Sequence, residues 1–191
     1  MESPYCYFRS LKINNIKVVY EDDNFIIYNK PNGLLTHPTN KSTELTLRDH
    51  LVKEHPSILS WGEENREGIV HRLDRVTSGL IVCALNLESY NLLKSKFKNR
   101  EIKKSYVALI EGALPSDSGI LNLPLTRSLK NRSKRTVDTN GRNSITNYEL
   151  INFYENLNIS RIELDLITGR NHQIRAHMEY MKTPILNDTL Y

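Results

Sequence analysis

The seventeen-residue stretch GIVHRLDRVTSGLIVCA, which begins at Gly68, constrains the fold of this chain more than any other segment. Its two apolar runs, IV and LIVCA, predict buried strands because they are short, rich in β-branched residues and bounded by turn formers. Gly79 ends the intervening turn, since glycine adopts positive φ at little cost. We therefore expect Arg72 and Asp74 on a loop held between core strands, where a folded scaffold presents reactive groups.

Composition limits the number of domains and the kind of partner. A chain of 191 residues with 39% hydrophobic residues is long enough for one compact domain with a sizeable core. We expect that domain over residues 18–191 and a short N-terminal arm over residues 1–17. The formal net charge of +4 and the sequence pI of about 9.0 favour a polyanionic partner.

Cysteine usage and hydropathy predict a cytoplasmic protein. Cys6 and Cys83 form no disulfide framework, and Cys83 lies in an apolar run, where a small buried side chain is expected. No apolar run approaches the length of a membrane span, and the N-terminal residues lack the apolar core of a signal peptide. We expect no membrane partner.

The hydrophobic pattern predicts an α+β fold rather than a doubly wound one, because hairpin-connected strands are interrupted by only a few helices. Apolar runs around an Asp-Asp-Asn turn predict a first hairpin. Asn86 is expected to cap a helix whose apolar stripe contains Leu87, Leu93 and Phe97. The expected strands cover residues 18–20, 25–28, 106–110, 120–123, 144–153 and 159–167, and the expected helices cover residues 45–54, 86–99 and 173–181.

Four blocks of the sequence resemble the RluA-type pseudouridine synthases, in the order that this family has them. They are the HRLD-x-x-TSG stretch, VVYEDDNFIIYNKPNGLLTHP, KKSYVALIEG and GRNHQIRAHMEYMKTPILNDTLY. The chain resembles a compact member of the family without an N-terminal S4-like domain. The resemblance implies a mixed, mostly antiparallel central sheet flanked by helices and loops, with the active cleft across its middle.

The resemblance implies that the chain isomerises uridine to pseudouridine and that Asp74 is the catalytic carboxylate. The reaction breaks the N1–C1′ bond and joins C5 to C1′, so it needs no oxidant, nucleotide or metal, and we expect no cofactor. Asp74 would either attack C1′ or act as a base at the ribose. From the local sequence alone, Asp74 could instead be a turn-capping aspartate beside Thr77 and Ser78.

Three more residues have roles that the resemblance implies. Arg72 would displace the target base or fill its place, since an enzyme acting at C1′ and C5 cannot reach them inside a stacked helix. Tyr106 would stack on the extruded uracil, and Arg175 would pair with the catalytic carboxylate and keep it ionised. The local alternatives are a core tyrosine and a surface arginine on an amphipathic helix.

Basic residues gather in two runs that predict RNA backbone contacts, although a solvated surface is the ordinary alternative. We expect ribosomal RNA of the large subunit first and transfer RNA next, read as structured stem-loops by a monomer. The first run contains Lys94, Lys96, Lys98, Arg100, Lys103 and Lys104, and the second contains Arg127, Lys130, Arg132, Lys134, Arg135 and Arg142.

Two features keep an alternative open, a catalytically inactive RNA-binding module of the same fold. Lys182 and Asn187 stand where the family typically has glycine, and either would strain a turn that needs positive φ, lysine more than asparagine. The sequence also stops at Tyr191, where relatives usually continue, so it is either truncated or lacks an edge strand. His172 and His177 are five residues apart and do not share a helix face, so we expect no metal site.

Overall fold

The computed structural model describes residues 16–39 and 43–191 and divides the chain after Glu101 into two compact units. We call residues 16–101 the N-terminal unit and residues 102–191 the C-terminal unit. The expected arm at 1–17 falls almost wholly outside the described residues. The extent of the catalytic domain, 18–191, stays a prediction.

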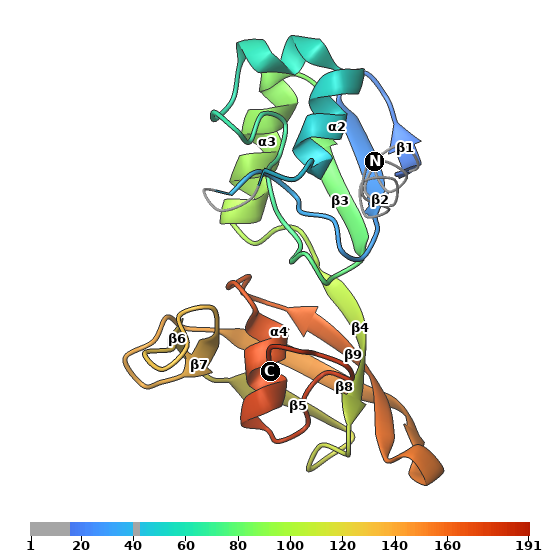
Figure 1. Ribbon diagram of the computed structural model, residues 1–191, viewed down its shortest axis with the longest axis vertical. Coiled ribbons are helices and arrows are strands. Elements are labelled where there is room, and N and C mark those ends of the chain that lie inside the picture. The colour runs from blue at the N-terminus through green and yellow to red at the C-terminus, as the bar shows by residue number, and fades with distance from the viewer. Residues whose placement is uncertain (1–15, 40–42) are drawn as a thin grey trace, which may run out of the picture. The chain divides into compact units, whose positions relative to one another are not determined.

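The N-terminal unit is built on a three-stranded antiparallel sheet in the order β1-β2-β3 (Figure 1). The predicted hairpin is present, with an Asp-Asp-Asn turn between its strands. Ile26 and Tyr28 alternate into the core, and Tyr28 meets the ring of His50 on a helix edge to face. The strands are β1 (Lys17–Glu21), β2 (Phe25–Lys30) and β3 (Gly79–Ala84), and the helices are α2 (Leu47–Glu54), a 3-10 turn (Pro56–Ser60) and α3 (Leu87–Lys98).

Local sequence signals explain where these helices begin. Asn86 caps α3 by accepting the backbone N–H of Ser89 at 2.9 Å, as predicted. Helix α2 begins at Leu47 because Thr46 and Asp49 form a reciprocal capping box. Leu87 was expected in the buried stripe of α3, and this is wrong, because its side chain is 49% exposed.

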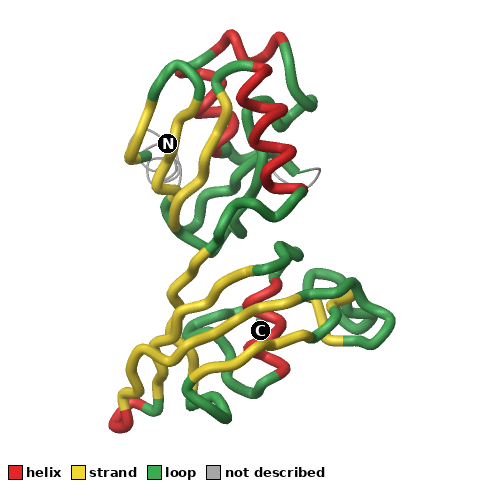
Figure 2. The backbone as a smooth tube through the Cα atoms, turned by 180° about the vertical axis from the view of Figure 1, so that it is seen from behind, coloured by secondary structure: helices red, strands yellow, loops and turns green. Residues whose placement is uncertain are grey.

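The C-terminal unit is built on a four-stranded antiparallel sheet in the order β4-β9-β8-β5, with helix α4 against one face (Figures 1 and 2). A two-stranded hairpin, β6–β7, follows β5 in the chain. Its elements are β4 (Ser105–Glu111), β5 (Ser118–Asn122), β6 (Leu125–Arg127), β7 (Arg135–Val137), β8 (Ile145–Tyr154), a 3-10 turn (Glu155–Leu157), β9 (Ile159–Leu166) and α4 (Gln173–Tyr180). The core contains Ile110, Leu121, Tyr148, Ile162, Leu164 and Met178.

The α+β class is confirmed, and all strand pairings among the described residues are antiparallel. The run Ile69-Val70 was expected to be a strand, and this is wrong. Ile69 forms only an isolated bridge to Cys83, after which the chain runs without regular structure to β3. No described helix is both long enough and apolar enough to cross a membrane.

The two residues at which the resemblance implies glycine both adopt left-handed backbone, with φ of 65° at Lys182 and 59° at Asn187. Lys182 follows the last turn of α4. Its N–H donates to the carbonyl of Glu179 at 3.1 Å, and the N–H of Thr183 donates to the carbonyl of Met178 at 3.0 Å. This pair of bonds is a Schellman motif, in which the left-handed position usually holds glycine. The positive φ on which the predicted strain depends is therefore present at both turns.

Candidate active site

The loop that carries Arg72 and Asp74 is anchored on both sides of each residue. The backbone N–H of Val82 donates to Nε2 of His71 at 3.0 Å, and the His71 ring stacks on Phe97 with 4.5 Å between centroids. Leu73 is buried, and its backbone makes two bonds with the hydroxyl of Thr36, at 2.9 and 3.3 Å. The loop therefore holds its charged residues in fixed positions although it has no regular secondary structure.

Asp74 is half-buried at the start of a tight turn. Its carbonyl accepts the N–H of Thr77 at 3.0 Å, and the turn ends at Gly79, whose φ is 128°. The backbone of Asp74 therefore closes this turn, and the alternative of a turn-capping Asp74 side chain stays a prediction.

Lys30 supports this turn from inside the protein, a role that the sequence did not reveal. Its side chain is fully buried, and its ammonium donates to the carbonyls of Pro31, Leu34 and Arg75 at 3.0, 2.8 and 3.4 Å. Burial lowers the pKa of Lys30 to about 8, while the charge of Asp74 raises it. One signal was available, because Lys30 continues the inward alternation of β2.

Arg72 is exposed, and His37 orients it. Nη1 of Arg72 lies 3.1 Å from Nε2 of His37, and Nδ1 of His37 lies 2.9 Å from the carbonyl of Pro38. A carbonyl only accepts, so Nδ1 carries the proton and Nε2 accepts from the guanidinium. Burial lowers the pKa of His37, the bond to the carbonyl of Pro38 opposes this by raising it, and the charges of Arg72 and Arg66 lower it further. His37 therefore remains neutral at pH 7 and can accept this bond.

In the C-terminal unit, Arg175 is only 9% exposed, so the reading of a surface arginine is wrong. Its Nε and Nη2 donate to the two carboxylate oxygens of Asp188 at 2.6 and 2.8 Å. Burial raises the pKa of Asp188, but bonds from Arg175 and from the N–H groups of Leu190 and Tyr191 outweigh it and hold the pKa below its usual value. The bidentate contact fixes the plane of the guanidinium.

Tyr106 lies on β4, opposite Leu164 of β9, on the face of the sheet that carries the core. Tyr106 is half-buried and packs against that core, so the alternative of a core tyrosine is partly correct. The ring also remains partly accessible, as a stacking surface must be. Its role with uracil stays a prediction.

Arg72 and Asp74 thus belong to the N-terminal unit, and Tyr106 and Arg175 to the C-terminal unit. The predicted pairing of Arg175 with Asp74 stays a prediction, because each unit is described by itself. The proposed metal-free chemistry also stays a prediction. Among residues 16–39 and 43–191, no group of three or more His, Cys, Asp or Glu side chains is placed to hold a metal ion.

Acidic partners from distant parts of the chain neutralise several cations of the two basic runs. In the first run, Lys94 pairs with Glu63 at 2.7 Å and Lys103 with Asp165 at 3.2 Å. In the second run, Lys134 pairs with Glu179 at 2.6 Å. These partners lie outside the two runs in sequence, so counting charges within each run does not reveal them.

Comparison with known proteins identifies the family. The profile of the family described as RNA pseudouridylate synthase matches residues 24–180. Ribosomal large subunit pseudouridine synthase D of Borreliella burgdorferi is 38% identical over 180 residues, which cover 92% of this chain and 54% of that protein. Dual-specificity RNA pseudouridine synthase RluA of Pasteurella multocida is 39% identical over 177 residues, which cover 92% of this chain and 77% of that protein.

The fold agrees with the sequence match. The structure of human RNA Pseudouridylate Synthase Domain Containing 1 has a TM-score of 0.75 and 25% identity, and the match covers 98% of this chain and 71% of the human one. The chain spans about half the length of several curated relatives that it matches. Its sequence and its fold place it, by these matches, in the RNA pseudouridylate synthase family, among the RluA-type members.

Proposed function

We propose that the chain is an RNA pseudouridine synthase that acts on ribosomal RNA of the large subunit, with transfer RNA as the second candidate. The observation that carries the proposal is the Asp74 loop. A half-buried carboxylate lies on a turn fixed by Thr36, His71 and the internal ammonium of Lys30, inside the region that the family profile matches. An inactive RNA-binding module would not need so many contacts to fix the turn that carries one carboxylate.

The reaction requires one reactive carboxylate and no external reagent. The N1–C1′ bond breaks, the uracil turns, and C5 joins C1′. N1 gains a proton and C5 loses one, so atoms and electrons balance without oxidant, nucleotide or metal. Asp74 serves either as the nucleophile at C1′ or as the base at the ribose, and both routes use the same ionised carboxylate.

The remaining site residues would contact the target base or stabilise the negative charge of the catalytic carboxylate. Arg72, exposed and oriented by His37, enters the RNA stack in place of the extruded uridine. Tyr106 offers its partly accessible ring to the uracil. Arg175 supplies the cation that keeps the catalytic carboxylate ionised.

The preference for ribosomal RNA follows the names of several relatives, which are ribosomal large subunit synthases, while one relative is called a dual-specificity enzyme. Cations at the tip of the β6–β7 hairpin would contact the RNA backbone. We propose that the enzyme acts as a monomer in the cytoplasm, where ribosomal and transfer RNA are both accessible to it.

Mapping pseudouridine in total RNA from cells with and without the gene tests the function and identifies the substrate. We expect one or a few sites in ribosomal or transfer RNA to revert to uridine when the gene is deleted, and to return with the wild-type gene but not with Asp74→Asn. Identical maps in all strains would contradict the proposal. Restoration by Asp74→Asn would show that Asp74 is not the catalytic group.

A further inference from the structure

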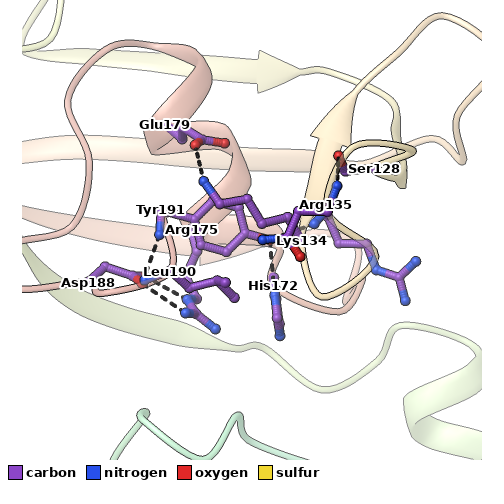
Figure 3. Close-up of polar contacts among 10 residues, drawn as sticks. Ser128, Lys134, Arg135, His172, Arg175, Glu179, Asp188, Leu190 and Tyr191 are labelled. Atoms are coloured by element: carbon purple, nitrogen blue, oxygen red, sulfur yellow. Dashed lines mark hydrogen bonds and ion pairs between the residues drawn. The ribbon is translucent and has the colours of Figure 1, made fainter.

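Tyr191 lies in a polar cluster that joins helix α4 to the β6–β7 hairpin (Figure 3). Its hydroxyl accepts the backbone N–H of Arg135 at 2.6 Å and lies 2.9 Å from Nδ1 of His172. A phenol oxygen that accepts one bond can donate its own proton to a second group. The hydroxyl therefore bridges β7 and the residue that precedes α4.

The ring of Tyr191 also lies against two cations. Cζ of Arg175 and Nζ of Lys134 are each 4.9 Å from its centroid, which is within the range of cation–π attraction. Each cation has a carboxylate of its own, Asp188 for Arg175 and Glu179 for Lys134, each at 2.6 Å. Both cations that face the ring are therefore already paired with carboxylates, which favours a mechanical role for the ring over an anion site.

Burial indicates which part of the cluster the fold orders most strictly. The side chains of Arg175 and Asp188 are only 10% and 5% exposed, whereas those of Lys134 and Glu179 are 25% and 39% exposed. A buried ion pair gains little net stability, because desolvation offsets its attraction. The bidentate pair with Asp188 fixes the plane of the Arg175 guanidinium, and the ring of Tyr191 fixes its distance from that ring and the side on which it packs.

We propose that Tyr191 is a positioning residue for Arg175, and that through it the β6–β7 hairpin sets the orientation of the guanidinium. The inference rests on the proposed function, in which Arg175 supports the catalytic carboxylate. Lys134 and the backbone of Arg135 hold Tyr191, and Tyr191 holds Arg175. RNA that binds the hairpin would thereby steady a group needed for chemistry.

Single-turnover kinetics test this with the full chain, using source-organism large-subunit ribosomal RNA transcribed with [5-³H]uridine, at saturating enzyme. Tyr191→Leu removes the ring, and Tyr191→Phe keeps the ring while removing the hydroxyl. We expect Tyr191→Leu to lower the rate constant roughly 10-fold to 100-fold, because small misplacements of catalytic groups cost this much. Tyr191→Phe should lose less, because the ring still lies against both cations although the hydroxyl bond to β7 is gone. A wild-type rate for Tyr191→Leu, or equal losses in both variants, would overturn the role of the ring.

A double-mutant cycle separates positioning from a structural defect. Arg175→Lys cannot make the bidentate, stacked contact, so the losses from Arg175→Lys and Tyr191→Leu should be strongly non-additive, whereas independent defects would add. Additive losses would overturn the proposal.

A measurement without RNA distinguishes failure of this inference from failure of the proposed function. The Nε–H resonance of Arg175, assigned by its loss in Arg175→Lys, should be protected from solvent exchange in the wild type. It should exchange at least about 10-fold faster in Tyr191→Leu, and also faster in Lys134→Met, which keeps the stem of the side chain but removes its charge. Unchanged exchange in both variants would overturn the proposal. A wild-type chain that makes no pseudouridine would count against the proposed function alone.

Discussion

At the scale of single residues, Lys182 occupies a backbone conformation that is costly for a residue with a side chain. It occupies the left-handed position of the Schellman motif after α4, with φ of 65°. A residue with a side chain pays roughly 1–2 kcal/mol to adopt this conformation. Glycine avoids that cost, but it loses more conformational entropy on folding, which offsets part of the gain in stability.

We expect Lys182→Gly to raise the free energy of unfolding by about 1 kcal/mol. Urea denaturation measures this change. Lys182→Ala is the matched control, because it removes the charge but keeps Cβ, and it should not stabilise. Asn187→Gly should gain less, since asparagine tolerates left-handed backbone better than lysine. Equal effects of glycine and alanine at position 182 would show that the turn is not strained.

The sequence motifs assign site roles to Asp74, Arg72, Tyr106 and Arg175, but they do not show what the residues that hold them contact, although these lie within the quoted blocks. Lys30, His37, Asp188 and Tyr191 act through tertiary contacts. Lys30 meets the carbonyl of Arg75, 45 positions away, and His37 meets Arg72, 35 positions away. Contacts of this kind follow from the fold and have no local pattern. Only the inward register of Lys30 on β2 could have been read beforehand.

At the scale of elements, the hairpin β6–β7 carries its cations in two different settings. Lys130 and Arg132 are exposed near its tip, whereas Lys134 is engaged with Glu179 and Tyr191. The sequence treats these cations as one run, but the structure gives the tip and the base of the hairpin different surroundings.

We expect the double reversal Lys130→Glu, Arg132→Glu to weaken RNA binding and to reduce the slope of log affinity against log salt by about 1 for each residue. The rate constant at saturating RNA should change little. Reversal of Lys17 and Lys53, which are exposed outside both basic runs, controls for net charge. Filter binding at several salt concentrations measures the slope. A slope unchanged from that of the wild type would mean that the RNA follows another path.

The elements that the sequence predicted well are those with signals inside the element itself. Alternation identifies β4, β8 and β9, and Asn86 correctly marks the start of α3. The run Ile69-Val70 failed because a short apolar run can be buried without strand pairing. Leu87 failed because one apolar residue in the first turn of a helix does not define which face is buried.

At the scale of the whole molecule, buried histidines make stability sensitive to mild acid. Burial lowers the pKa of His37, His50 and His177 below the ordinary value of 6.5. Below that pH the unfolded chain binds protons that the folded protein does not, so the free energy of unfolding must fall as pH falls. Carboxylates with a lowered pKa, such as Asp188, also stabilise the folded state, and their contribution to the free energy of unfolding is lost only at lower pH.

We expect the free energy of unfolding to fall as the pH falls from about 7.5 towards about 5, by at most about 1.4 kcal/mol per pH unit for each histidine. His177 is fully buried, and its two ring nitrogens bond to Thr146 and Leu123. His177→Asn should therefore reduce the slope, whatever it does to the stability at neutral pH. Urea unfolding across this pH range gives the slope. A slope of opposite sign would show that these histidines bind protons in the folded state.

Release of tritium from RNA labelled with [5-³H]uridine tests the central claim most directly, because C5 must lose its hydrogen when it joins C1′. Wild-type protein should release tritium from source-organism ribosomal or transfer RNA. Asp74→Asn, which preserves the shape of the side chain but removes its charge, should bind the same RNA with similar affinity and release none above background. Release by Asp74→Asn at a rate near that of the wild type would contradict the account.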